Sequence, residues 1–433
     1  MVFKLGLLGL GTVGTGTAEI LLNPEGRNPL LKEIEIKSVG VRSLSKARSV
    51  SFPEGVLTDD LESIINDPDI DIIVELMGGL EPVRSLLIKA IANGKHIVTA
   101  NKAAIATHGA EIFDAAQEAG VYVLLEAAVG GGIPILKPLK EALGVNRISR
   151  ITGIVNGTTN YILTQMTQKG ANFADVLAEA QNLGYAEADP TADVGGLDAA
   201  DKIAILASLA FGGRIKREDV YTEGITKVDA ADISYAQQLG FTIKLLAIAQ
   251  QKTTDGQSLQ LRVHPTLLPQ DHPLASINGV YNAVLVEGEP IEQVMFYGPG
   301  AGAGPTASAV VSDIISIIGI LKSAQHSQRL NPLLSPEHQH YCAIAPMSEL
   351  ITRFYARFLC NDSPGIIGHL GTCFGQHNVS LESVVQIGYQ DSLAEIVVVT
   401  HDVTEADFHN ALEEIRGFSL LDNITIASVL RVW

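Results

Sequence analysis

The sequence predicts an α/β protein that begins with a doubly wound parallel sheet, continues with an α+β domain and ends with a compact βαββαβ domain. Three observations support this class. Short β-branched runs alternate with amphipathic stretches over the first third of the chain, a glycine-rich turn follows the first run, and residues 351–433 have their own strand and helix order. The chain of 433 residues also exceeds the length that one hydrophobic core usually serves, so several domains are expected.

Residues 1–135 form the first expected domain, a Rossmann-type α/β unit. Strands are predicted at 3–9, 34–41, 70–76, 96–100 and 121–127. The segments between them have helical periodicity, and several end in the Gly or Asn that commonly stops a helix. Residues 298–322 are a glycine-rich loop that opens into an apolar helix, and we expect the part from about 300 to 322 to complete this domain.

The rest of the chain divides into three further segments. Residues 136–305 predict an α+β domain, with helical stretches at 173–183, 197–211 and 230–250 before strands at 259–264, 281–288 and 293–298. Residues 323–350 are polar, rich in Pro and His and without a period, which predicts a linker. Residues 351–433 follow a split-βαβ, ferredoxin-like order that is able to fold by itself.

Composition excludes several functional classes. The 48 Asp and Glu outnumber the 30 Lys and Arg, and the net charge of −18 would repel a phosphate backbone, so we expect no nucleic-acid partner. No signal peptide opens the chain and no uninterrupted apolar run reaches the ~18 residues of a membrane span, so no membrane partner is expected. Three cysteines without metal-ligand spacing predict buried thiols in a reducing compartment, and we expect a cytoplasmic protein.

A GxGxxG turn follows the first predicted strand and opens a helix, which is the context that a dinucleotide site requires. Gly9 permits the tight turn, Gly11 lets the backbone approach a pyrophosphate, and Gly14 lets the helix pack closely on the strand. The intervening Thr12 and Val13 would also border the phosphates at the positive end of the helix.

Arg42 follows the second predicted strand, where an NAD site usually offers a carboxylate to the ribose. A guanidinium there suits a 2′-phosphate, so NADP is favoured over NAD, which stays possible. The alternative is a solvated arginine at a strand end.

Two further segments border the carboxyl ends of the predicted parallel strands. Lys102 directly follows the strand 96–100 and would direct a positive charge at a substrate or a nicotinamide, unless it is an ordinary surface lysine. The turn that starts at Glu126 and contains Val129, Gly131 and Ile133 exposes backbone carbonyls beside one carboxylate. Such hard oxygens suit a cation, although an interdomain hinge fits the turn equally well.

The segment 184–202, GYAEADPTADVGGLDAADK, is the most distinctive of the chain. Asp198 and Lys202 stand four residues apart on one helix face, next to apolar neighbours. In one interpretation Lys202 moves a proton while Asp198 and Glu187 hold an ammonium group. In the other, Asp198 and Lys202 are an exposed ion pair that adds little to stability. The residues alone do not decide between them. Asn156 and Thr158 similarly either line a polar pocket or cap the next helix.

Taken together and in this order, these segments resemble the homoserine dehydrogenase family, in its single-function form with a C-terminal ACT-type regulatory domain. The segments that carry the resemblance are GLGTVG, VTANKA, EAAVGGGIPI, NGTTNYIL, GYAEADPTADVGGLDAADK and GPGAGAGPTA. No aspartokinase-like region precedes the nucleotide segment, so we do not expect the bifunctional form. The resemblance assigns 136–305 to substrate binding and dimerisation and 351–433 to an ACT domain.

The resemblance implies NAD(P)-dependent interconversion of homoserine and aspartate 4-semialdehyde, in threonine, methionine and isoleucine biosynthesis. It makes Lys202 the acid and base of catalysis, with Lys102 assisting beside the nicotinamide. It implies homoserine binding by Glu187 and Asp198, and we expect Asn156 and Thr158 to line the same site. Sodium would be held by the carbonyls of Glu126, Val129, Gly131 and Ile133, and Gly184 and Gly302 would touch the cofactor.

For the tail, the resemblance is to amino-acid-sensing domains that pair across a dimer, so a homodimer or homotetramer is expected. An effector, with threonine the natural candidate, would bind at Asn361, Asp362, Gly365 and Ile366, with Gln386 a possible partner. A domain used for assembly alone is the alternative. A dehydrogenase of another amino-acid-derived alcohol and a non-catalytic sensor stay as further alternatives, the latter disfavoured by the complete set of lysines and carboxylates.

Overall fold

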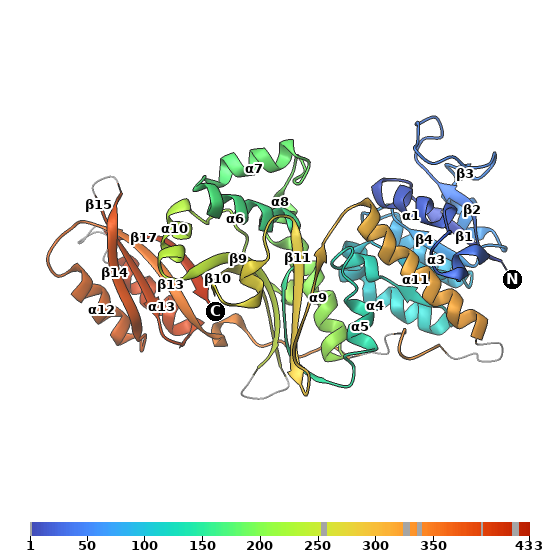
Figure 1. The fold of residues 1–433 in the computed structure, drawn as a ribbon. Helices are drawn as coiled ribbons and strands as arrows, with labels where there is room; N and C mark the ends of the chain where they lie inside the picture. Colours follow the sequence, from blue (N-terminus) through green and yellow to red (C-terminus); the bar gives the residue numbers. More distant parts are fainter. Residues whose placement is uncertain (1, 253–257, 324–329, 336–339, 391–392, 418–423) are drawn as a thin grey trace. The chain divides into compact units, whose positions relative to one another are not determined.

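The computed structural model describes residues 2–252, 258–323, 330–335, 340–390, 393–417 and 424–433 (Figure 1). The chain divides into two compact units, each described here by itself. The first unit holds Met1–Ile151, Asp201–Asp219 and Tyr281–Cys342, and the second holds Thr152–Ala200, Val220–Val280 and Ala343–Trp433. Parts of the predicted linker 323–350 lie outside the described residues.

A six-stranded parallel sheet forms the core of the first unit, which confirms the doubly wound prediction. Its strand order is β3-β2-β1-β4-β5-β6, so the chain reverses direction across the sheet between β1 and β4. Ligands of such sheets bind beyond the carboxyl ends of the strands at this reversal. The strands are β1 (Phe3–Leu8), β2 (Ile34–Gly40), β3 (Leu57–Thr58), β4 (Ile72–Glu75), β5 (His96–Thr99) and β6 (Val123–Leu124).

Helices cover this sheet, and one of them comes from much later in the chain. Gly16 is where the late helix α11 packs closely on α1, because a Cβ at Gly16 would lie 2.8 Å from the carbonyl oxygen of Ala303. Ile314, Ile317 and Ile318 of α11 belong to the same core cluster as the strands. The helices are α1 (Thr12–Leu22), α2 (Leu61–Asn66), α3 (Val83–Ala92), α4 (Lys102–Ala119), α5 (Leu136–Lys140) and α11 (Ala303–Ser323).

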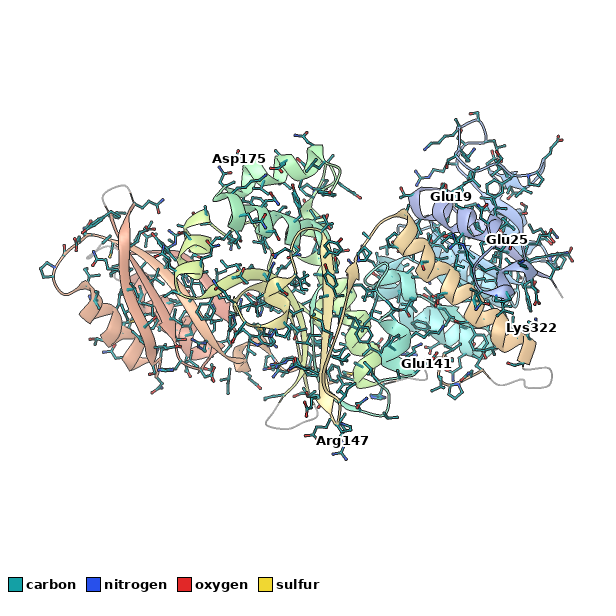
Figure 2. The ribbon with its side chains drawn as sticks, viewed as in Figure 1. Glu19, Glu25, Glu141, Arg147, Asp175 and Lys322 are labelled. Atoms are coloured by element: carbon teal, nitrogen blue, oxygen red, sulfur yellow. The ribbon has the colours of Figure 1, made fainter. Side chains whose placement is uncertain are left out.

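Among the described residues, α11 is long and apolar enough to cross a membrane by length and composition alone. Half of its most apolar window is buried inside the protein. That burial is what a core helix of the first unit requires. The labelled charged side chains of Figure 2, which include Lys322 at the end of α11, are exposed.

The first unit also contains an antiparallel hairpin. Strand β11 (Tyr281–Glu289) pairs with β12 (Glu292–Pro299), and β11 is the neighbour of β7 (Arg147–Ile154), whose last residues belong to the second unit. Arg150 of β7 and Glu287 of β11 form an ion pair with a 2.5 Å N–O distance. The hairpin returns the chain to the glycine-rich loop that precedes α11.

The second unit is built on a mixed sheet in the order β9-β10-β17-β13-β15-β14. Two short strands extend it, β8 (Tyr221–Thr222) beside β10 and β16 (Val403–Thr404) beside β13. The long strands are β9 (Phe241–Gln251), β10 (Leu259–Pro269), β13 (Ile351–Cys360), β14 (Leu381–Gln390), β15 (Leu393–Thr400) and β17 (Thr425–Val432). The helices are α6 (Gly157–Lys169), α7 (Phe173–Asn182), α8 (Thr191–Val194), α10 (Ala230–Gln238), α12 (Ile366–Gln376) and α13 (Glu405–Gly417).

The prediction of one helix over 230–250 is wrong. Helix α10 ends at Gln238, Gly240 follows with φ +84°, and β9 begins at Phe241. Most of β9 is buried because it lies between two neighbouring strands. A strand buried on both faces reads as a continuous apolar run, which sequence periodicity does not separate from a buried helix.

The order β13-α12-β14-β15-α13-β17 confirms the βαββαβ prediction for the tail. Its sheet is not separate, however, since β17 pairs in parallel with β10 at Thr266↔Arg431 and Leu267↔Val432. The tail therefore shares one continuous sheet with the preceding segment of the second unit.

Helix α9 (Leu197–Phe211) starts in the second unit, and its residues from Asp201 belong to the first, which contains Asp201–Asp219. It carries both Asp198 and Lys202, four residues apart as predicted.

Candidate functional site

The glycine turn after β1 has the backbone that a dinucleotide site needs. Gly9 has φ +105°, and a Cβ there would lie 2.8 Å from the carbonyl oxygen of Leu76. A Cβ at Gly14 would lie 2.3 Å from the carbonyl oxygen of Gly9, so only glycine lets α1 approach the strand. Gly11 differs, because no atom lies within 4 Å of its Cβ position. The space at Gly11 is therefore open to a ligand, and the turn fits a pyrophosphate.

Thr12 and Val13 are the first residues of α1, whose N-cap, Gly11, has no side-chain cap hydrogen bond. Arg42 lies just beyond β2 and is exposed. Arg48 organises the loop after it by donating hydrogen bonds to the carbonyl oxygens of Ser43 at 2.5 Å and Lys46 at 2.7 Å. The exposed guanidinium of Arg42 thus stands at the edge of the sheet where a ribose would lie.

Glu75, the last residue of β4, is a residue of this edge that sequence reasoning missed. It is fully buried, and its carboxylate accepts hydrogen bonds from the backbone N–H of Met77 at 2.8 Å and from Thr99 Oγ1 at 2.6 Å. Burial raises the pKa of Glu75, while these hydrogen bonds lower it. The signal that could have identified Glu75 is a carboxylate at the end of the apolar run 70–76.

Lys102 begins α4, and its neighbour Asn101 fixes that helix start. Asn101 Oδ1 accepts a hydrogen bond from the N–H of Ala104 at 3.0 Å, and its Nδ2 donates one to the carbonyl oxygen of Gly79 at 2.7 Å. The N–H of Asn101 also donates to Thr99 Oγ1 at 3.0 Å, which ties it to Glu75. These bonds connect the loops after β4 and β5 and position Lys102 at the strand ends.

The predicted cation turn is closed by the side chain of Glu126, which is buried. Its carboxylate accepts hydrogen bonds from the N–H groups of Ile135, Leu136 and Lys137, at 2.6 to 2.8 Å. Its own N–H donates to Asp313 Oδ2 at 2.8 Å. The carboxylate is thereby committed to the backbone, so any cation ligand from Glu126 would be its carbonyl oxygen.

The glycines of this turn adopt left-handed conformations, with φ +73° at Gly130 and +52° at Gly131. A Cβ at Gly131 would lie 2.4 Å from the carbonyl oxygen of Gly300, so the turn packs directly on the loop before α11. Among the described residues, no loop or turn hydrogen bond between backbone groups ends on the predicted cation carbonyls of Glu126, Val129, Gly131 and Ile133. The turn therefore fits a cation that takes carbonyl ligands. Gly302, with φ +127°, lies in that same loop.

Asn156 is the centre of the polar cluster in the second unit. Its Oδ1 caps α6 by accepting a hydrogen bond from the N–H of Thr159 at 2.8 Å. Its Nδ2 donates to Asp193 Oδ1 at 2.7 Å and to Asp198 Oδ2 at 2.8 Å. Asn156 therefore caps α6, as one of the two interpretations predicted, and it also binds two carboxylates, while its place in a substrate pocket stays a prediction. Asp193 is a second carboxylate of this cluster, for which the sequence predicted no role.

Thr158 holds the loop that contains Gly184 and Glu187. Thr158 Oγ1 donates a hydrogen bond to the carbonyl oxygen of Tyr185 at 2.6 Å. Gly184 has φ +77°, which favours glycine, and Glu187 is exposed. Asp198 and Lys202 are both buried, with 6% and 8% of their surface exposed, which excludes the reading of a solvated surface pair. Lys102 and Lys202 belong to the first unit, and the other predicted substrate residues to the second.

The predicted effector loop joins β13 to α12. Gly365 is the N-cap of α12 with φ +99°, and Ile366, the first residue of α12, is buried. Asp362 accepts a hydrogen bond from Tyr389 Oη at 2.5 Å. Asn361, like Asp362, is exposed, and Gln386 lies exposed on β14, the edge strand that also carries Tyr389.

Two other features lie outside the predicted site. A cavity of about 520 Å³ between α4 and α9 in the first unit is lined by apolar side chains and by the charged residues Lys140, Arg214, Lys216, Arg217 and Glu218. Cys373, His377 and Glu414 place potential ligand atoms within 4.8 Å of one another. Protein partners satisfy this cluster, because Cys373 Sγ bonds to the carbonyl of Ala411 and His377 to Glu414. Cys360 and Cys373 are the buried thiols expected, and Cys342 is partly exposed.

Comparison with known proteins gives one consistent family. Residues 9–126 match the family model described as "Homoserine dehydrogenase, NAD binding domain", residues 134–315 match "Homoserine dehydrogenase", and residues 354–418 match "ACT domain". A homoserine dehydrogenase of Synechocystis sp. is 67% identical over 433 residues, which cover 100% of both chains. That of Bacillus subtilis is 41% identical over 425 residues, or 97% of this chain and 96% of the relative.

Solved structures agree with this. The crystal structure of a homoserine dehydrogenase from Thiobacillus denitrificans matches with a TM-score of 0.91 and 42% identity, covering 100% of this chain and 98% of that one. A hyperthermophilic archaeal homoserine dehydrogenase in complex with NADPH matches with a TM-score of 0.61 and 28% identity, covering 74% of this chain and 98% of that one.

Proposed function

The chain belongs to the homoserine dehydrogenase family, and from that premise we propose how its residues act. When bound, the nicotinamide cofactor exchanges a hydride with the carbon that bears the homoserine hydroxyl. Lys202 takes the hydroxyl proton as homoserine is oxidised to aspartate 4-semialdehyde, and it returns a proton to the forming alkoxide in the reverse direction. The observation that supports this role is the burial of Lys202 one helical turn after Asp198, on a single helix. Lys102, held at the strand ends by Asn101, assists as a fixed positive charge beside the nicotinamide.

Homoserine carries an ammonium group, and the carboxylates of the second unit supply its counter-charge. Asp198 is oriented by Asn156, which removes the freedom of the carboxylate to turn away. Glu187 is presented by the loop that Thr158 holds through Tyr185. We assign the ammonium group chiefly to Glu187, with Asp198 and the polar groups of Asn156 and Thr158 completing the site.

The preferred cofactor is NADP, with NAD a weaker alternative. Arg42 provides an exposed guanidinium at the end of β2 instead of the carboxylate that an NAD site offers to the ribose hydroxyls. The NADPH complex of the archaeal relative is consistent with this preference. The pyrophosphate is held by the turn residues Gly9, Gly11, Thr12, Val13 and Gly14. The cofactor is also bordered by Gly184 and Gly302.

The carbonyl turn would hold a sodium ion. The four carbonyls of Glu126, Val129, Gly131 and Ile133 supply hard oxygen ligands, and the Glu126 carboxylate keeps their turn closed. When bound, the ion would supply a positive charge that holds the four carbonyls together, and Gly131 of this turn packs on Gly300 of the loop before α11.

The ACT domain is regulatory, and threonine is its effector, bound at Asn361, Asp362, Gly365, Ile366 and Gln386. Exposed apolar side chains on two edge strands support a homodimer or homotetramer. On β12 and its neighbour β11, Tyr297 and Tyr281 stack with ring centroids 5.2 Å apart, and on β14 Val384, Val385 and Tyr389 are exposed. Threonine bound at such an edge would be shared between subunits. Its action as an effector would link the enzyme to threonine biosynthesis.

One assay tests these proposals together, by following the oxidation of NADPH and NADH at saturating aspartate 4-semialdehyde. We expect a higher kcat/KM with NADPH, stimulation by sodium over an equal concentration of a large organic cation, and inhibition by millimolar threonine. A clear NADH preference would overturn the cofactor assignment. No response to threonine would leave the ACT domain with a role in assembly alone.

A further inference from the structure

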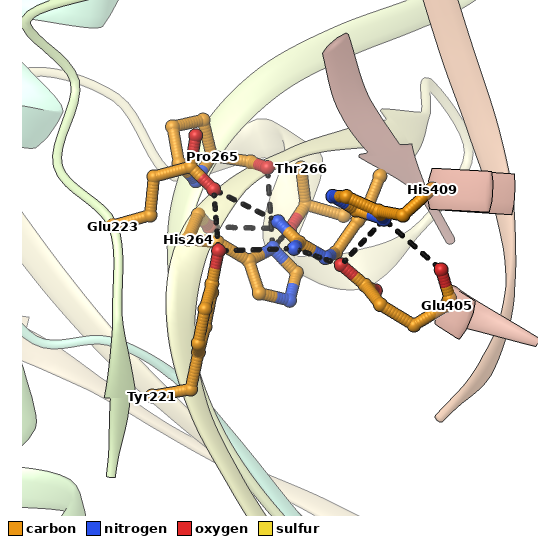
Figure 3. Close-up of polar contacts among 8 residues, drawn as sticks. Tyr221, Glu223, His264, Pro265, Thr266, Glu405 and His409 are labelled. Carbon is orange, nitrogen blue, oxygen red and sulfur yellow. Dashed lines mark hydrogen bonds and ion pairs between the residues drawn. The ribbon is translucent and has the colours of Figure 1, made fainter. Parts of the chain in front are cut away.

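Arg431, near the end of the chain on β17, lies in a buried ionic cluster of the second unit. Figure 3 labels its partners Tyr221, Glu223 and Glu405. Its guanidinium donates to both carboxylate oxygens of Glu405, at 3.1 and 2.5 Å. From its other side it donates to Glu223 Oε2 at 2.9 Å and to Tyr221 Oη at 3.2 Å. Only 6% of the Arg431 side chain is exposed. One arginine of the ACT domain thus binds both its own helix α13 and the segment 221–225 that precedes α10.

The two acceptors from the segment 221–225 are themselves connected. Tyr221 Oη donates a hydrogen bond to Glu223 Oε2 at 3.2 Å, and the Arg431 guanidinium carbon lies 5.0 Å from the Tyr221 ring centroid. The backbone of the segment is fixed on β10, since the N–H of Glu223 donates to the carbonyl oxygen of Val263 at 2.8 Å. Strands β8 and β17 both pair in parallel with β10, at neighbouring positions.

A neutral histidine of β10 lies beside the cluster. His264 of β10 is buried, and its Nδ1 lies 2.9 Å from Thr266 Oγ1. Burial lowers the pKa of His264, and the neighbouring charges of Arg431 and Arg262 lower it further. His264 therefore adds no positive charge beside Arg431, whose carboxylate partners are Glu405 and Glu223.

The same segment packs against the turn from which α9 begins. A Cβ at Gly224 would lie 2.0 Å from the carbonyl oxygen of Val194 and 2.6 Å from the Cα of Gly195. The N–H of Ile225 donates to the carbonyl oxygen of Val194 at 2.8 Å. Gly196, with φ +83°, faces Thr222 on the other side, with its Cβ position 3.2 Å from Thr222 Cγ2. The turn Val194–Gly196 is thus packed closely against residues 222–225, so a displacement of one backbone segment would displace the other.

We propose that Arg431 is a positioning residue for homoserine binding: through Glu223 and Tyr221 it fixes the segment 221–225, which in turn fixes the start of α9 and the carboxylate of Asp198. Asp198 lies two residues after Gly196 in α9. A shift of the segment therefore moves one of the groups that Asn156 orients for substrate. The ACT domain in this way takes part in building the substrate site in every turnover, whether or not an effector is bound.

The competing explanation is that the cluster only stabilises the fold. Arg431 keeps its bidentate partner Glu405 when Glu223 is changed, so loss of Glu223 leaves no buried charge unpaired. The side chain of Glu223 is 28% exposed, which also makes its replacement tolerable. Glu223 and Tyr221 are therefore the positions at which positioning and stability separate.

The test compares Glu223→Ala, Glu223→Gln and Tyr221→Phe with Glu413→Gln, which removes an exposed ACT-domain ion pair with Arg416 as a matched control. We expect Glu223→Ala to raise the KM for homoserine about three- to tenfold, with a smaller rise for Glu223→Gln and Tyr221→Phe, since one charge-assisted hydrogen bond is lost or weakened. The KM for the cofactor and the melting temperature should stay close to wild type. Hydrogen exchange of residues 194–200 should quicken in Glu223→Ala and stay unchanged in Glu413→Gln.

A KM for homoserine within twofold of wild type in both Glu223→Ala and Tyr221→Phe would overturn the proposal, whatever the exchange rates. The proposal rests on the assignment of Asp198 to homoserine, so Asp198→Asn is measured in parallel. If Asp198→Asn leaves this KM unchanged, the assignment of Asp198 fails. If Asp198→Asn raises it and the Glu223 and Tyr221 variants do not, the coupling to Arg431 alone fails.

Discussion

Asn156 Nδ2 lies 2.8 Å from Asp198 Oδ2, and the same nitrogen lies 2.7 Å from Asp193 Oδ1. One amide group at the start of α6 thus holds a carboxylate of α8 and a carboxylate of α9, all in the second unit. A neutral donor orients a carboxylate at little cost, because no second charge must be desolvated. Asp198 is one of the two carboxylates that we propose for binding the ammonium group of homoserine, and Asp193 lies beside it on the same amide.

Replacement of Asn156 by Ser separates its two tasks. Serine still caps α6 but has no amide to reach Asp193 and Asp198, so the carboxylates repel each other and turn. We expect the KM for homoserine to rise about tenfold with the helix cap largely preserved. Asn172→Ser, at the N-cap of α7, is the matched control and should leave this KM unchanged. Equal effects of the two substitutions would mean that Asn156 acts as a cap alone.

Two glycines of the turn after β1 should respond differently to alanine. Gly14→Ala places a methyl group 2.3 Å from the carbonyl oxygen of Gly9, so it should destabilise the first unit by about 1 to 3 kcal/mol. Gly11→Ala meets no protein atom within 4 Å and should fold normally, yet raise the cofactor KM because the methyl group occupies the path of the pyrophosphate. Thermal melting and cofactor titration measure both effects. A normal cofactor KM in Gly11→Ala would refute the phosphate assignment.

Arg42→Ala tests the choice of cofactor. Loss of a guanidinium that binds a 2′-phosphate should lower kcat/KM with NADP by about tenfold or more and leave kcat/KM with NAD nearly unchanged. The NAD measurement is the internal control, since it reports any general damage to the site. A similar fall for both cofactors would show that Arg42 does not distinguish them.

Asp313 predicts an unusual pH dependence of stability. Burial, and then the nearby charge of Glu126, raises its pKa from 3.8 to about 7. The folded state therefore keeps this proton while the unfolded state releases it, so the free energy of unfolding falls as the pH rises from about 4 to about 7 and is level above that.

Asp313→Asn removes this titration but keeps an acceptor for the N–H of Glu126. Near pH 4 we expect the free energy of unfolding of the variant to equal that of wild type or to be lower. At pH 8 we expect it to exceed that of wild type by a few kcal/mol. Denaturant unfolding at the two pH values provides the comparison, with Asp59→Asn, at an exposed position, as the control. A difference between variant and wild type that does not change with pH would contradict the raised pKa.

Local patterns were sufficient to predict much of the fold. The strands and helices around the GxGxxG turn and the βαββαβ tail were predictable because each element carries its own periodicity and its own stop signal. Strand β9 was not, since its burial by neighbouring strands erases the alternation that marks a half-exposed strand. The pairing of β17 with β10 depends on residues more than 150 positions apart, and no local signal marks it.

The residues of the candidate site likewise include some that the sequence predicts and others that only the structure reveals. Lys102, Asp198 and Lys202 stand out because charged residues are rare beside apolar runs. The roles of Glu75 and of the Glu126 carboxylate come from hydrogen bonds to backbone groups of other loops, which sequence spacing does not report. Arg431 and Glu223 are 208 residues apart, and each alone reads as an ordinary surface charge.

The role of Lys202 in proton transfer is the central claim, and Lys202→Met tests it most directly. The measurement is kcat for NADPH-dependent reduction of aspartate 4-semialdehyde at saturating substrates, together with the Kd for NADPH from cofactor fluorescence. Methionine keeps the length of the side chain and cannot donate a proton, so we predict a fall in kcat of about 100-fold or more, with an unchanged Kd. A kcat within a few-fold of wild type would contradict the account.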